Sequence, residues 1–366
     1  MTSTAELQAV QRVTIRERSD PWCASFEASL DAERAPLALP HRSSWASRFG
    51  SGQSLFVGLT DEAGRARYGC GVDVTRLRSL PGHVVYRIQR FGYTLGHESA
   101  VTLLREVAAH AREHSTVLRL VVEAFAGEPG SLEALTSAVQ ALGFTPSVPP
   151  QRYTRTLRLE LRDNAEATLE ALPKTARRNL RTAQKSGLVV RAIDDASEAP
   201  AIAALEREAF ARTGGQATPT DWPALIGYAR ENPDLVRIVG IFSEPAGAPS
   251  ELLGFATGRF HGDHVEYASA GTTRRPWLKI SIGYPLLWHL VEWAHAVGAT
   301  WFDFGGITAG TVGDGAGALG GISDFKRHFG GAEIEVGGEW MLPLSPLRSA
   351  MADAISRVTG AMRRRG

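Results

Sequence analysis

Apolar and polar positions alternate along the chain in a way that predicts two consecutive series of strands and helices. In the first series, β-type alternation or short apolar runs fall at 12–18, 54–74, 83–92 and 116–125. Helical spacing covers 98–113 and 131–142, and Gly143 follows the second helix in the position of a C-cap. The stretch 54–74 is expected to be a hairpin with its turn at 61–64.

A second series follows a stretch that is interrupted by Pro146, Pro149 and Pro150. Its predicted strands are 153–161, 188–193, 235–243 and 299–307, and 252–271 is expected to be a hairpin. A basic helix follows the first strand, and further helices are predicted at 199–211 and 282–297. An Ala-His-Ala triplet precedes a strand in both series, at 109–111 and at 294–296. This recurrence indicates an internal duplication.

Strands that alternate with helices in this way predict an α/β (α+β) fold with two units, each built on a mixed central sheet. The length of 366 residues also favours two cores over one. We expect a first domain at 1–150, a second domain with the catalytic segment at 151–345, and a basic amphipathic helix at 346–366. No long heptad run is present, so no coiled-coil arm is expected.

The overall composition is that of an ordinary globular protein, with 43% hydrophobic and 22% charged residues. The formal net charge is only +1, which disfavours a protein that coats nucleic acid. The amino terminus lacks the apolar run of a secretion signal, and no apolar run is long enough to span a membrane. We therefore expect a cytoplasmic protein in which Cys23 and Cys70 are free thiols.

The helix predicted within 172–191 carries a row of cations. Four of them lie at helical spacing on one face: Lys174, Arg178, Arg181 and Lys185. Arg177 lies beside this face and widens the row. Cations three or four residues apart repel each other by a few tenths of a kcal/mol per pair. A polyanion such as a phosphate chain would offset this repulsion. The alternative interpretation is a solvated helix face.

A glycine-rich segment at 302–331 carries the second chemical signal. Eight of the seventeen residues from Gly305 to Gly321 are glycine, but the phosphate-binding P-loop pattern is absent. A short helix capped by Ser323 is expected next, with Phe325 and Phe329 facing inward. Lys326 then lies beside that buried face, where it can stabilise a developing negative charge or bind phosphate. A mobile surface loop and a solvated lysine are the alternatives.

Other polar residues can line a pocket but are more often structural when taken singly. They are Tyr267, Ser269 and Thr272 on or after a strand, and Arg48 on a short helix. His110 and His114 match a short zinc-peptidase pattern, but no third ligand is suitably spaced, and we predict no metal. No motif for a covalent nucleophile is present.

Three segments together resemble the Fem family of aminoacyltransferases. They are the basic helix and its following strand (KTARRNLRTAQKSGLVVR), the stretch from YASAGTT to WFDFGGI, and GISDFKRHFGG. The resemblance covers residues 150–345 well and the first half only in outline. It implies two tandem domains of the acetyltransferase (GNAT) type, without the coiled-coil arm that some members have.

The resemblance implies that an amine attacks the ester of an aminoacyl-tRNA and forms an amide. It places Lys326, after Phe325, at the catalytic site, and the row of cations on the tRNA backbone. It implies substrate binding by the glycine-rich strand and by the residues named above: Asp303, Gly305, Gly306, Arg48, Tyr267, Ser269 and Thr272. Aminoacyl-tRNA is then the co-substrate, and no other cofactor is expected.

The acceptor and the oligomeric state stay open at this stage. The family's cell-wall members place a basic residue near 210–218, where this chain has Gly214, Gly215 and Gln216. A peptide or small-molecule amine is therefore considered beside a muropeptide. The alternative activities are an acyl-CoA-dependent N-acyltransferase, which lacks its usual pyrophosphate-binding turn here, and an RNA-binding module, which lacks stacking aromatics on the basic helix.

Overall fold

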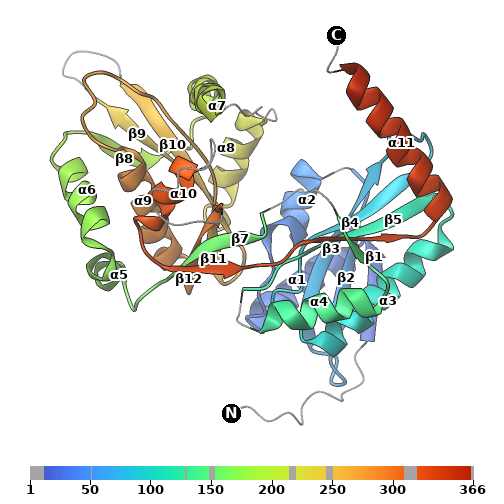
Figure 1. Cartoon of the computed structure of the whole chain (residues 1–366). Coiled ribbons are helices and arrows are strands. Elements are labelled where there is room, and N and C mark those ends of the chain that lie inside the picture. Colours follow the sequence, from blue (N-terminus) through green and yellow to red (C-terminus); the bar gives the residue numbers. More distant parts are fainter. Residues whose placement is uncertain are drawn as a thin grey trace. The chain divides into compact units, whose positions relative to one another are not determined.

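The computed structural model describes residues 12–50, 52–127, 130–147, 153–213, 220–244, 250–308 and 320–363. The chain divides into two compact units (Figure 1). The first unit comprises residues up to 154 together with those from 335 onward, and the second comprises residues 155–334.

The first unit is built on a seven-stranded mixed sheet. In spatial order its strands are β1 (Arg12–Glu17), β2 (Ser54–Thr60), β3 (Ala66–Arg76), β4 (Val84–Phe91), β5 (Val117–Ala124), β14 (Glu339–Pro343) and β6 (Thr145–Pro146). Only β4 and β5 run parallel, and the other neighbours are antiparallel. Its helices are α1 (Pro21–Ala32), the 3₁₀ turn Leu39–His41, α2 (Ser43–Phe49), α3 (His97–Glu113), α4 (Ser131–Ala141) and α11 (Pro346–Arg363).

The second unit has a sheet of the same size. In spatial order its strands are β13 (Ala332–Glu335), β7 (Arg155–Glu160), β12 (Trp301–Gly306), β11 (His264–Thr272), β10 (Glu251–Phe260), β9 (Val236–Ser243) and β8 (Val189–Ala192). Its helices are α5 (Ala165–Ala171), α6 (Lys174–Gln184), the 3₁₀ turn Ala196–Glu198, α7 (Ala199–Thr213), α8 (Trp222–Glu231), α9 (Gly283–Ala296) and α10 (Gly320–Arg327). Here β11 and β12 form the parallel pair.

The two sheets follow one plan, which confirms the predicted tandem organisation. Strands β1 to β5 correspond in order to β8 to β12, and the fourth and fifth strands are parallel in both units. A helix, α3 or α9, links those two strands in each case. The Ala-His-Ala triplets lie at the carboxyl ends of these two helices.

In each sheet, the strand that pairs with the outer side of the fifth strand comes from a separate part of the chain: β14 pairs with β5, and β7 pairs with β12. Strand β7 follows β6 in sequence but pairs with β12 in the second sheet, whereas β14 follows β13 and pairs with β5 in the first. The expected second domain, 151–345, therefore ends too late. Residues 339–343 of that stretch complete the first sheet because their backbone pairs with β5, and α11 also belongs to the first unit.

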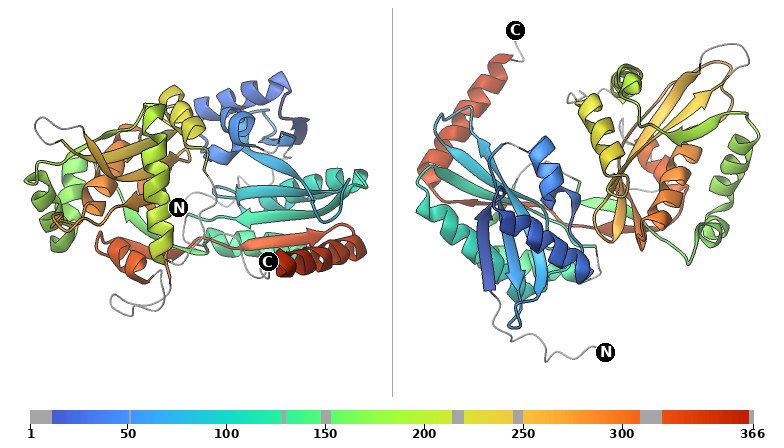
Figure 2. Two further views of the ribbon diagram at one scale, coloured as in Figure 1. Left: turned by 90° about the horizontal axis from the view of Figure 1, so that it is seen from above. Right: turned by 180° about the vertical axis from the view of Figure 1, so that it is seen from behind.

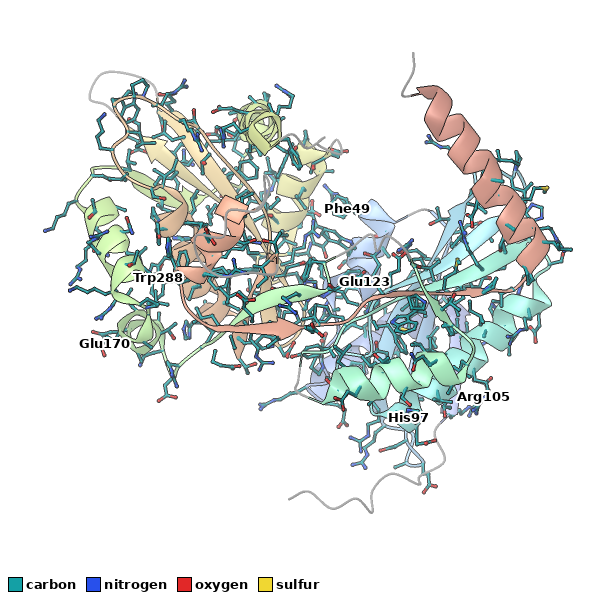
Figure 3. All side chains as sticks on the ribbon, in the orientation of Figure 1. Phe49, His97, Arg105, Glu123, Glu170 and Trp288 are labelled. Carbon is teal, nitrogen blue, oxygen red and sulfur yellow. The ribbon has the colours of Figure 1, made fainter. Side chains whose placement is uncertain are left out.

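Each sheet carries its own apolar core. Helix α9 packs on the second sheet because most of its length is apolar, and it buries Leu287, Leu290 and Val291 completely or nearly so. Trp288 lies on the same helix (Figure 3). In the first unit α3 packs on the sheet in the same way, and its Leu103 and Leu104 are fully buried. No helix in the described ranges is long and apolar enough to cross a membrane.

Candidate active site

The parallel strands β11 and β12 part in the middle of the second sheet. They pair from His264–Trp301 to Glu266–Asp303, and their pairing ends there although both strands continue. The register of β10 against β11 also jumps by one residue, so Ala268 is the extra residue of a bulge. Strands that separate leave backbone groups available for a ligand. In the first unit the corresponding pair β4 and β5 continues to Phe91–Ala124.

The chain turns sharply where β12 leaves its neighbour. Gly305 has a φ of +69°, and a Cβ there would lie 3.0 Å from the Tyr267 carbonyl oxygen, so both the conformation and the space favour glycine. The fully buried carboxylate of Asp303 accepts a hydrogen bond from the Gly305 amide at 2.7 Å. The Thr156 hydroxyl of β7 contacts that carboxylate and lies 2.9 Å from the Gly305 carbonyl oxygen. Side chains from two strands thus hold the turn in place.

Lys326 of α10 lies at this turn. Its Nζ donates a hydrogen bond to the Gly306 carbonyl oxygen at 2.6 Å and lies 5.5 Å from the centroid of the Tyr267 ring. Only 6% of the residue is exposed, and burial lowers the pKa of the lysine to about 8 in spite of the nearby carboxylates of Asp303 and Glu266. A lysine with this pKa is mainly charged at neutral pH but can release its proton readily.

Aromatic packing fixes the helix that carries Lys326. Phe329 is fully buried and Phe325 partly so, which confirms that both rings face inward. The Tyr284 ring of α9 stands 5.1 Å from each of these two rings. The Phe325 ring also covers the first turn of α9, because a Cβ on Gly283 would come within 2.8 Å of it.

The expected cap of this helix is wrong. Helix α10 begins at Gly320, so Ser323 lies inside it. The Ser323 hydroxyl instead accepts a hydrogen bond from the Thr308 amide at 3.0 Å, which ties the end of β12 to α10. Most of the glycine-rich segment, at 309–319, lies outside the described residues.

The row of cations forms one exposed face of α6. Lys174, Arg178, Arg181 and Lys185 are exposed and Arg177 is half-buried. The opposite side of the helix buries Ala176, Leu180 and Ala183. Among the described residues, none of these cations has a carboxylate partner. The face therefore carries uncompensated positive charge.

Helix α6 and the lysine helix are adjacent within the second unit. Pro173, at the start of α6, packs on Gly330 after α10, because a Cβ on that glycine would lie 3.1 Å from the proline ring. Burial raises the pKa of Tyr284, and the guanidinium of Arg178 lies close enough to oppose this. The Tyr284 hydroxyl is 3.1 Å from Nδ1 of His328, which follows α10. The cationic face thus approaches the elements that hold Lys326.

The remaining predicted residues lie elsewhere. The Ser269 hydroxyl is 2.9 Å from that of the buried Thr257, and the Thr272 carbonyl oxygen accepts a hydrogen bond from Arg212. Arg48 is exposed on α2 of the first unit. Their roles in substrate binding stay predictions. Gly214, Gly215 and Gln216 lie outside the described residues.

Sequence reasoning missed two polar residues of the site. Thr156 gives no signal, because it lies in an ordinary alternating strand. Glu266 does give a signal, since it is a carboxylate in an apolar strand. In the structure Glu266 is buried, and its Oε2 lies 3.1 Å from Nε2 of His261. Across the described residues, no cluster of three or more His, Cys, Asp or Glu residues is arranged to hold a metal.

Comparisons with known proteins agree with this architecture. A family model described as "Acetyltransferase (GNAT) domain" matches residues 172–327. The crystal structure of FemX superposes with a TM-score of 0.72 at 14% identity, and the match covers 90% of this chain and 98% of that one. The structure of L-PGS from Bacillus licheniformis gives 0.52 at 12% identity and covers 93% and 97%. A search of curated proteins finds no match.

Two sheets of one plan, together with the domain match over residues 172–327, show that the chain has a tandem GNAT-like fold. More particularly, its fold is the Fem-like form of that class, since the FemX structure matches almost from end to end. The domain match supports an acyltransferase.

Proposed function

We propose that this protein transfers an aminoacyl group from aminoacyl-tRNA to an amine and so forms an amide bond. One observation carries the proposal: the buried Lys326 and the unpaired cationic face of α6 lie on adjacent elements of one unit. The lysine suits a site where charge develops, and the face suits a phosphate chain.

The chemistry needs few protein groups because the aminoacyl ester is already activated. The acceptor nitrogen attacks the ester carbonyl carbon, and negative charge develops on the carbonyl oxygen. The C–O bond to the ribose then breaks, the nitrogen loses a proton, and the ribose oxygen gains one. As an ammonium, Lys326 would stabilise the developing charge or give its proton to the leaving oxygen. Phe325 would hold α10 in position.

Further parts of the second unit have roles in this proposal. Tyr267 and the turn at Gly305 and Gly306 would line the place where the ester binds, since they surround Nζ of Lys326. Aminoacyl-tRNA is the co-substrate and no other cofactor is required. Because charged tRNA is found in the cytoplasm, we place the protein there. The acceptor would be a small-molecule, peptide or muropeptide amine.

An acyl-CoA-dependent N-acyltransferase is the second candidate, because the matching domain is described as an acetyltransferase. Anions such as a diphosphate bind readily at the first turn of a helix. Here the ring of Phe325 covers the first turn of α9 at Gly283. We therefore favour tRNA as the donor.

Purified protein should be incubated with a panel of amines and either charged tRNA or acetyl-CoA, with each donor labelled on its acyl group. We expect acyl-labelled amide only with charged tRNA. Activity that depends strictly on acetyl-CoA would overturn the proposal in favour of the second candidate. Activity with neither donor across amino acids and muropeptide amines would also count against it.

A further inference from the structure

Helix α11 is held against the first unit by one of its faces. The Ser349 hydroxyl donates a hydrogen bond to the Leu118 carbonyl oxygen at 3.1 Å, and Asp353 pairs with Arg119 of β5 at 2.7 Å. Ala352 between them is fully buried. Both Figure 1 and Figure 2 show the helix running beside the strands of that unit. The helix therefore has a fixed orientation on β5.

The opposite face of α11 is apolar and exposed. Leu347 is 87% exposed and Met351 is 47% exposed, and Leu347 is the most exposed large apolar side chain in the described ranges. Ala350 and Ala354 are exposed beside them. We call these four residues the outer stripe. Their spacing of three and four residues is that of one helix face.

An exposed apolar stripe of this kind marks a surface that binds another protein molecule or a membrane. The charge of the segment indicates which of the two it binds. Residues 346–366 include Arg348, Arg357 and three consecutive arginines from 363, but only one acidic residue, Asp353, which Arg119 already pairs. A second copy of the same segment would be repelled by this charge, whereas a negatively charged lipid surface would attract it.

We propose that α11 docks on an anionic lipid surface, with the outer stripe at the boundary between headgroups and acyl chains. Amphipathic helices with basic residues bind membranes in this way, lying in the interface without crossing it. The contacts of Ser349 and Asp353 with β5 hold the stripe outward before binding, so little ordering is needed on docking. The protein would thus work at a membrane surface.

The test is sedimentation of the full-length protein with phosphatidylcholine vesicles that contain or lack phosphatidylglycerol. We expect binding only to the anionic vesicles, and weaker binding as salt screens the arginines. Replacing both Leu347 and Met351 with serine removes apolar area without changing charge, and it should weaken binding about tenfold or more. Trp277→Ser is the matched control, because that side chain is 52% exposed but lies in the second unit. It should leave vesicle binding unchanged.

Two results would overturn the proposal. The first is absence of binding to anionic vesicles, or binding that the double substitution leaves intact. The second is a wild-type dimer that the double substitution converts to a monomer in light scattering, which would make the stripe an interface between copies. Neither result depends on the acyl donor, so this proposal and the proposed function can fail separately.

Discussion

At the scale of single residues, the unusual feature is a cation held almost out of water. The pKa of Lys326 falls from 10.5 to about 8 because burial disfavours its charged form. A shift of this size corresponds to roughly 3 kcal/mol of lost stability at neutral pH. A protein keeps such a residue when its chemistry requires it. The lysine should therefore be essential for activity and unfavourable for stability.

Replacing Lys326 with methionine tests both consequences. We expect transfer activity to fall by about 10²–10³-fold, because the developing charge loses its partner. The free energy of unfolding at pH 7 should rise. The stability of the wild type relative to the variant should increase as pH goes from about 8 towards 10.5, since only the unfolded lysine keeps its proton in this range. Burial raises the pKa of the Cys23 and Cys70 thiols in both proteins, so their titration cancels in this difference. Urea unfolding across this pH range measures the effect.

The variant Lys326→Met should lack this contribution of the lysine to the pH dependence. Lys279→Met is the control, because Lys279 is an exposed lysine of the same unit. It should leave the pH dependence and the activity unchanged. Full activity in the Lys326 variant would remove the lysine from the mechanism.

Thr156 is predicted to be a positioning residue. Its hydroxyl contacts Asp303 and the Gly305 carbonyl oxygen, so Thr156→Val should loosen the turn that aligns Lys326. We expect kcat to fall about tenfold with little change in KM for charged tRNA, and stability to fall by about 1–2 kcal/mol.

The control for Thr156 is Thr168→Val. Thr168 is also buried in the second unit, but its hydroxyl contacts the Arg162 amide and His295. It should lose similar stability and keep its kcat. Equal losses of kcat in both variants would indicate that Thr156 has only a structural role.

At the scale of elements, the cations of α6 repel one another and lack carboxylate partners in the described part of the chain. Changing Arg178 and Arg181 to glutamine should weaken binding of tRNA and reduce the slope of its salt dependence by about one per residue. The fold should be slightly more stable, because like charges are removed. Filter binding at several salt concentrations measures the slope.

A matched pair elsewhere controls for net charge. Arg105 (Figure 3) and Arg112 are exposed on α3 of the first unit. Their change to glutamine removes the same charge and should leave the salt slope nearly unaltered. If both pairs lower the slope equally, tRNA binding depends on overall charge and not on α6.

The elements were largely predictable from the sequence because their signals are local. The spacing of cations against Ala176 and Leu180 defined α6, and Gly143, with a φ of +81°, follows α4 as expected. The place of strand β14 in the first sheet was not predicted, because its sequence pattern does not reveal that it pairs with β5, more than two hundred residues earlier. Lys326 was expected beside a buried face. Its own burial depends on the Gly305 turn and Thr156, which only the folded chain brings together.

At the scale of the whole molecule, the two units differ in the continuity of their chain, because the chain passes from the first sheet to the second at β7 and returns to the first sheet at β14. The second unit is one continuous stretch of chain, and its sheet needs nothing outside residues 155–335. The first unit needs β14, which brings Trp340 and Leu342 into its core. The core of the first unit is therefore complete only when this later segment of the chain is in place.

This asymmetry predicts how fragments behave. Residues 155–335 alone should unfold cooperatively, with the near-ultraviolet circular dichroism of a packed core. Residues 1–154 alone should be less stable by roughly 3–5 kcal/mol than the same unit in the full chain, because β5 loses its neighbour and two large side chains leave the core. Adding a peptide of residues 335–366 should restore part of this difference. Equal stability of residues 1–154 with and without the peptide would show that β14 contributes little, and that the sheet of the first unit closes by another route.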